Sequence, residues 1–106
     1  MQKAMLIITT TSSLENAEKI AKVLVEEKIA ACVNIVPKVI SYYIWENKLN
    51  KDEEFLLIVK TTEERAEDAR RKIKELHNYQ LPEVIFLRVD GGESEYLKWI
   101  FESVKR

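Results

Sequence analysis

The order of apolar, β-prone runs and amphipathic helical patterns restricts the fold of this chain more than any other feature. Residues 5–10 form a β-prone apolar run, and apolar residues then recur with helical spacing up to about Lys28. Residues 53–60 form another such run, and a second helical pattern follows, with Ala66 and Ile73 on its apolar side. The chain therefore contains two strand–helix units.

Each helical pattern opens on a hydroxyl residue that stands three positions before a glutamate. The pairs are Ser12 with Glu15 and Thr61 with Glu64. In a capping box of this kind the hydroxyl oxygen accepts a hydrogen bond from a backbone N–H of the first turn, and the glutamate side chain reaches back to the capping residue. We therefore expect the two helices to begin at Ser12 and Thr61.

The segment between the two units is typical of a long β-hairpin. Residues 30–36 and 39–45 are rich in β-branched and aromatic side chains. Pro37 stands between them, and proline in a strand predicts a bulge or bend. The polar residues 46–52 are expected to connect this arm to the strand at residues 53–60.

A fourth strand and a last helix complete the pattern. Residues 83–89 are β-prone, residues 91–92 are glycines that predict a turn, and Ser94 opens a further helical pattern. The order βαββαβ with a C-terminal helix predicts an α+β, ferredoxin-like fold, in which helices cover one face of a four-stranded antiparallel sheet. No linker or low-complexity segment divides residues 1–106, so we expect a single domain.

The strands are apolar on both faces, although helices are expected to cover only one. Continuous apolar runs occur at residues 5–8, 55–59 and 84–87. One interpretation is that these side chains fill strand ends or stay half exposed, as single apolar residues often do. The interpretation that we favour is that further copies of the chain cover the second face, since self-association commonly buries such surfaces.

Composition and charge exclude several classes of partner. The chain has 17 Lys and Arg against 18 Asp and Glu, so its formal net charge of −1 creates no strong field for nucleic acid or anionic lipid. Its apolar runs are far shorter than the roughly 20 residues that cross a bilayer. We expect no nucleic-acid or membrane partner, and the lack of a signal-peptide pattern at the N-terminus predicts a cytoplasmic protein.

One histidine and one cysteine are the candidates for metal ligation or nucleophilic chemistry. His77 follows the second helical pattern, and it is either a helix C-cap or a metal ligand. Cys32 and Asn34 share a strand face, so a Cys-His-Asn constellation would exist if His77 lay beside them. No cationic cluster adjoins Cys32 in the sequence to activate its thiol, and we favour a small buried hydrophobe. The chain carries none of the common catalytic motifs, so we expect no enzymatic activity.

Three further residues suit binding or packing. Lys60 ends the apolar strand, where a buried stem with a solvated ammonium is the ordinary explanation and an anion contact is the alternative. Tyr43 and Trp45 share a strand face near the tip of the hairpin. They suit either packing between subunits, which we favour, or the wall of a pocket.

Several segments in combination resemble the CutA family of divalent-cation tolerance proteins, from the first strand to the last helix. In chain order, the matching residues are Ala30, Ala31, Cys32, Val33, Asn34, Ile35, Pro37, Ser41, Tyr43, Trp45, Lys60, Thr61, His77, Tyr79, Pro82, Glu83, Tyr96, Leu97 and Trp99. The chain departs from the family pattern at Asn47, where a glycine is usual, and at Asn78, where a proline commonly follows the histidine.

The resemblance implies a homotrimer of P-II-like architecture that is linked to tolerance of divalent cations and to copper binding, without known catalysis. It also implies the metal ligands His77 and Glu83, with Cys32 as a further candidate, for copper or another divalent cation bound weakly. Thr9 stands about where some members carry a second cysteine. A cysteine–histidine copper site would therefore lack one of its ligands.

The alternative function is a P-II-like signalling or scaffold module. Its cleft between subunits would be lined by Tyr43, Trp45, Lys60 and His77. Such a cleft would bind a small anionic ligand or a protein partner.

Overall fold

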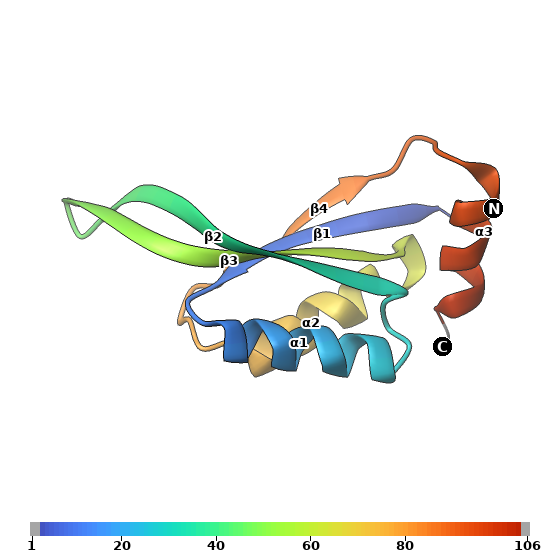
Figure 1. Ribbon diagram of the computed structural model, residues 1–106, viewed down its shortest axis with the longest axis horizontal. Coiled ribbons are helices and arrows are strands. Elements are labelled where there is room, and N and C mark those ends of the chain that lie inside the picture. Colours follow the sequence, from blue (N-terminus) through green and yellow to red (C-terminus); the bar gives the residue numbers. More distant parts are fainter. Residues whose placement is uncertain (1–2, 105–106) are drawn as a thin grey trace.

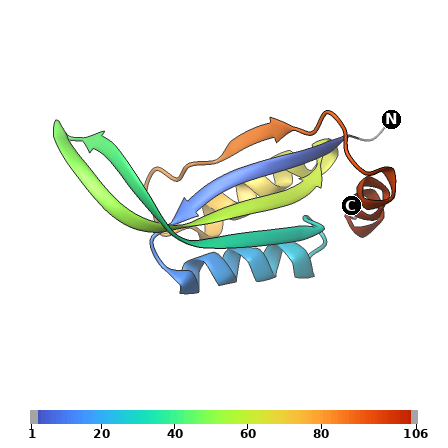
Figure 2. The same ribbon diagram turned by 45° about the horizontal axis from the view of Figure 1, so that its top comes forward.

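The computed structural model describes residues 3–104 and confirms the predicted α+β architecture (Figure 1). The elements are β1 (Ala4–Thr11), α1 (Leu14–Glu26), β2 (Cys32–Trp45), β3 (Lys48–Thr62), the short 3-10 helix η1 (Glu63–Arg65), α2 (Ala66–Leu76), β4 (Ile85–Arg88) and α3 (Ser94–Ser103). The strands form one antiparallel sheet in the order β2-β3-β1-β4. Helices α1 and α2 cover one face, and α3 lies at the end of the sheet where β1 begins (Figure 2).

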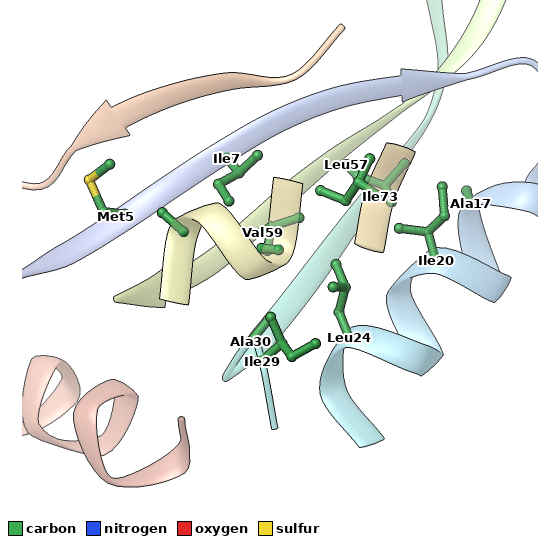
Figure 3. Packing of buried hydrophobic residues seen from close by; sticks show 12 residues of the cluster. Met5, Ile7, Ala17, Ile20, Leu24, Ile29, Ala30, Leu57, Val59 and Ile73 are labelled. Carbon is green, nitrogen blue, oxygen red and sulfur yellow. The ribbon is translucent and has the colours of Figure 1, made fainter. Parts of the chain in front are cut away.

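The core lies between the sheet and the layer formed by α1 and α2 (Figure 3). Ile7 of β1 pairs with Val59 of β3, and both are fully buried. The apolar stripes of the helices place Ile20, Leu24 and Ile73 against them, also fully buried. Burial of each such side chain stabilises the fold by roughly 1.5–3 kcal/mol, which explains why the helical stripes dominate the sequence pattern.

The helix starts differ from those that the capping boxes predict. The N-cap of α1 is Ser13 and not Ser12, because the Ser13 hydroxyl oxygen accepts a hydrogen bond of 3.1 Å from the backbone N–H of Asn16. Thr61 is a fully buried residue of β3, and its hydroxyl donates to the carbonyl oxygen of Ile29 over 2.6 Å. The chain then enters α2 through η1, so the prediction of a helix start at Thr61 was wrong.

The turn of the hairpin is tighter than predicted. The polar residues 48–52 belong to β3, so Glu46 and Asn47 alone connect Trp45 to Lys48. Both turn residues have positive φ, 52° and 65°, as a type I′ turn requires. Asparagine tolerates this conformation better than most residues, which explains how the turn closes without a glycine.

The predicted irregularity at Pro37 is confirmed. The pairing of β2 with β3 shifts its register between Val36 and Val39, and Lys38 has a φ of 61°. Beyond this bulge the two strands continue as a ribbon of their own. We call residues 39–54 the hairpin arm.

The hairpin arm projects beyond the layer of helices (Figure 1). It stretches the described chain to 45 × 25 × 21 Å and its radius of gyration to 14.3 Å, against about 13 Å for a compact chain of this length. Large apolar side chains of the arm stay open to solvent, with Ile40 57% exposed and Leu49 70% exposed. A two-stranded ribbon is only marginally stable by itself.

The face of the sheet opposite α1 and α2 carries apolar side chains, as the sequence pattern predicted. Leu6 and Ile8 of β1 alternate with the buried residues of that strand and are half-buried. Ile85 and Leu87, their register partners on β4, are about half exposed. We call this surface the open face.

Candidate functional site

A hollow of about 710 Å³ lies between the hairpin arm and the loop that follows α2. Strand β2 contributes Tyr43 and Trp45 to its lining, and β3 contributes Glu54. The loop contributes Tyr79 and Glu83. Aromatic rings and carboxylates therefore face the same space.

The register of the hairpin arm explains why these side chains meet. Residues at every second position of a strand point to the same face, so Ser41, Tyr43 and Trp45 share one side of β2. Glu54 lies on the same side, because it pairs with Val39 across the ribbon. The loop after α2 supplies further lining residues, and Tyr42 and Ile44 from the other side of β2 also border the hollow, which is open to solvent.

Two phenols donate hydrogen bonds to carboxylates at this site. The hydroxyl of Tyr79 donates to Glu54 Oε2 over 2.6 Å, and that of Tyr43 donates to Asp52. Burial and the hydrogen bond to Glu54 raise the pKa of Tyr79 far above its usual value. The hydrogen bond to Asp52 raises the pKa of Tyr43. Both phenols therefore stay protonated at neutral pH and act as donors.

His77 is the C-cap residue of α2 and ties the loop to the sheet. Its Nε2 lies 2.8 Å from the carbonyl oxygen of Thr10, and its Nδ1 accepts a hydrogen bond of 3.0 Å from the backbone N–H of Tyr79. This pair of contacts selects the neutral tautomer with the proton on Nε2. Burial lowers the pKa of His77, while the Thr10 carbonyl and the charge of Glu54 oppose that shift.

The other candidates lie away from His77. Cys32 begins β2 opposite Lys60, with its Sγ 3.9 Å from Asn34 Oδ1. Lys60 pairs with Leu6 of β1, whereas His77 contacts the opposite end of that strand at Thr10. A single chain therefore does not assemble a Cys-His-Asn constellation.

Lys60 also lies outside the hollow. Its ammonium is 3.2 Å from the hydroxyl of Tyr96 and 5.4 Å from the centre of that ring. Tyr43 and Trp45 line the hollow, but Lys60 is not part of its lining. The residues expected to form an anion-binding cleft are thus not gathered within one chain.

The predicted metal ligands do not converge in one chain. Within residues 3–104, no group of three or more His, Cys, Asp and Glu side chains is placed to hold a metal ion. Glu83 lines the hollow, both ring nitrogens of His77 already have hydrogen-bond partners, and Cys32 lies at the far end of the sheet. These residues therefore do not form a cation site without ligands from another molecule, and their assignment stays a prediction.

Sequence reasoning missed Glu54 and Asp52. Both were assigned to a polar connection or to the start of a strand, without a role. The available signal was that these two carboxylates alternate with residue 53, so that they share one face of β3 and pair with Ser41 and Val39 of β2. This signal can be interpreted only when the two-residue turn is known, because the turn sets the register of β3 against β2.

The chain is similar to known proteins over most of its length. The family described as CutA1 divalent ion tolerance protein matches residues 5–103. A "Divalent-cation tolerance protein CutA" from Thermus thermophilus is 44% identical over 97 residues, which cover 92% of this chain and 94% of the relative. "Protein CutA, chloroplastic" from Arabidopsis thaliana is 40% identical over 102 residues, which cover 96% of this chain and 56% of the relative.

Solved structures agree with these matches. One is entitled "Structure of the Periplasmic divalent cation tolerance protein CutA from Archaeoglobus fulgidus". It superposes with a TM-score of 0.92 at 42% identity and covers 99% of this chain and 100% of its own. Both the sequence and the fold are therefore similar over nearly the whole length.

Proposed function

The chain belongs to the CutA1 divalent ion tolerance protein family, and from this premise we propose that it is a homotrimeric divalent-cation tolerance protein. In this proposal it binds copper or another divalent cation weakly and catalyses no reaction. The observation that carries the proposal is the pair of unpartnered apolar surfaces, the open face and the hairpin arm.

Self-association would cover both surfaces. Ile40, Tyr42 and Ile44 follow one another on one side of the arm and are 57–65% exposed. On the other side of the molecule, Ile85 and Leu87 lie on β4, which is an edge strand. A ring of copies requires two different surfaces that fit one another on each copy, and in this proposal the arm and the open face would be these surfaces.

Assembly also supports a cation site made of shared ligands. A single chain has one histidine and one cysteine, and neither lies in a cluster of ligands within residues 3–104. His77 and Glu83 would thus need ligands from a neighbouring copy, with Cys32 as a further candidate. Coordination by His77 would break its hydrogen bond to Thr10 or to Tyr79, which is the reason to expect weak binding.

Calorimetric titration with Cu²⁺ tests the metal part of the proposal. We expect weak, saturable binding that His77→Ala abolishes and Glu83→Gln reduces. Asn78→Ala is the matched control, because Asn78 adjoins His77, is exposed and is not a proposed ligand. Binding that is unchanged in His77→Ala would show that His77 has only a structural role.

We also propose that the protein is cytoplasmic. A single cysteine excludes a disulfide within one chain, which suits a reducing compartment. Within residues 3–104, none of the helices combines the length and apolar character needed to cross a membrane. Of the relatives described above, one is named as chloroplastic and one as periplasmic, so cell fractionation with a periplasmic marker is the appropriate test.

A further inference from the structure

We propose that the hollow beside the hairpin arm binds a small organic cation with an ammonium group, in which Glu54 is the counter-ion and Tyr43 and Trp45 are the aromatic walls. This ligand is not a metal ion. The inference therefore goes beyond the proposed function and does not depend on it.

The size of the hollow suits a small molecule. Its volume of about 710 Å³ falls within the range of small-molecule pockets, about 300–1,000 Å³. A water molecule occupies only about 30 Å³, so a bare ion would leave most of this space unfilled. A bare ion would also need several converging ligands, which the described residues do not provide.

The charge of the lining selects a cation. Glu54 exposes only 7% of its surface, and its one hydrogen bond within residues 3–104 comes from the phenol of Tyr79. It forms no ion pair with a described Lys, Arg or His. Glu83 adds a second carboxylate, and no Lys or Arg is among the described residues that line the hollow. A buried carboxylate is costly without a positive partner, and a ligand can supply one.

The walls favour an ammonium group in particular. Cations bind over the faces of tryptophan and tyrosine rings, and Trp45 and Tyr43 present such rings from the same side of β2. The phenol of Tyr79 already donates to Glu54, and that of Tyr43 already donates to Asp52. A ligand that pairs with Glu54 must therefore bring its own N–H donors, as a primary ammonium does.

The experiment uses three probes of equal chain length. They are 1,4-diaminobutane, which is dicationic, 1,4-butanediol, which is neutral, and succinate, which is dianionic. Each is titrated into the full chain by calorimetry, and by the emission of Trp45 in a Trp99→Phe background that removes the other tryptophan. The buffer contains EDTA, so that no metal ion contributes. We expect saturable binding of 1,4-diaminobutane only.

Two glutamate variants separate the site from general charge. Glu54→Gln keeps an acceptor for Tyr79 but removes the charge, and we expect it to weaken binding of the diamine by roughly ten- to a hundredfold. Glu53→Gln is the matched control, because Glu53 is exposed on the opposite side of β3. The affinity of this variant for the diamine should equal that of the wild type. If Glu54→Gln fails to fold, Trp45→Leu replaces it, since Trp45 is half exposed and the substitution should weaken binding severalfold.

Several results would overturn the proposal. They are the absence of saturable diamine binding at millimolar concentration, equal binding by wild type and Glu54→Gln, and binding of succinate or butanediol in place of the diamine. If a cationic side chain of a second copy already fills the hollow, saturable diamine binding will be absent, and the proposal is overturned. The diamine titration contains EDTA and no copper, so its outcome in the native chain does not depend on whether copper binds, and the two proposals fail separately.

Discussion

Replacement of Tyr79 by phenylalanine removes one hydroxyl and deprives the buried Glu54 of its donor. In the native chain this phenol donates to Glu54 Oε2 over 2.6 Å, and Glu54 is only 7% exposed. A hydrogen bond to a charged group contributes about 1.5–3 kcal/mol, and an unpaired buried acceptor costs a similar amount. Because Glu54 borders a hollow that water can enter, we expect a loss of about 2 kcal/mol in the free energy of unfolding.

The assay is equilibrium unfolding in guanidinium chloride at one fixed protein concentration, since the proposed assembly would make the midpoint depend on concentration. Tyr96→Phe is the matched control. Tyr96 is 42% exposed, and its hydroxyl accepts only an exposed hydrogen bond from the ammonium of Lys60 over 3.2 Å. The reasoning is refuted if Tyr79→Phe lowers stability no more than Tyr96→Phe does.

Three further predictions address the loop, the first helix and the thiol. Burial lowers the pKa of His77 from 6.5, with Glu54 opposing, so the neutral imidazole stabilises the fold fully above about pH 6.5, and this stabilisation is lost as the pH falls through the lower folded-state pKa. Between neutral pH and about pH 5, the melting temperature measured by calorimetry should therefore fall more for wild type than for His77→Gln. Equal falls in melting temperature would contradict this. Ser13→Ala should cost about 0.5–2 kcal/mol in chemical denaturation, whereas Ser12→Ala should cost little, and the reverse order would contradict the N-cap at Ser13. Cys32→Ser should leave assembly unchanged. The prediction of no catalysis would be overturned if the wild type released a burst of product from an activated ester and this variant did not.

The order of the elements was predictable because each helix buries a continuous apolar stripe. Ile20 and Leu24 of α1 and Ile73 of α2 all lie in the core, at the positions that helical spacing indicates. The capping residues were not predictable in the same way. Ser12 and Ser13 are adjacent hydroxyl residues, and the sequence favours neither of them as the N-cap. Thr61 is held in β3 by a hydrogen bond to Ile29, which is distant in sequence.

The hairpin shows a second reason for misassignment. Apart from Leu49, residues 48–52 are polar because a two-stranded ribbon exposes much of both sides to solvent, so polarity there does not indicate a loop. With the turn placed wrongly, the register of β3 against β2 could not be derived. Glu54 therefore could not be placed beside Tyr43 and Tyr79 from the sequence.

The placement of His77 depended on contacts that lie far apart in the chain. Its position after α2 was predicted from the helical pattern, but its bond to Thr10 joins two residues that only the folded sheet brings together. His77 occupies the C-cap position, which was one of the two alternatives considered for it, and the imidazole acts there as a neutral hydrogen-bonding group. Its assignment as a metal ligand stays a prediction.

The mass of the protein in solution tests the central claim most directly, because the proposed burial of the apolar surfaces and the proposed shared cation site both depend on assembly. Sedimentation equilibrium at micromolar concentration should give three times the chain mass of 12.4 kDa. A homogeneous monomer or dimer under these conditions would contradict the account. It would also leave Ile40, Tyr42 and Ile44 of the hairpin arm exposed without a physical explanation.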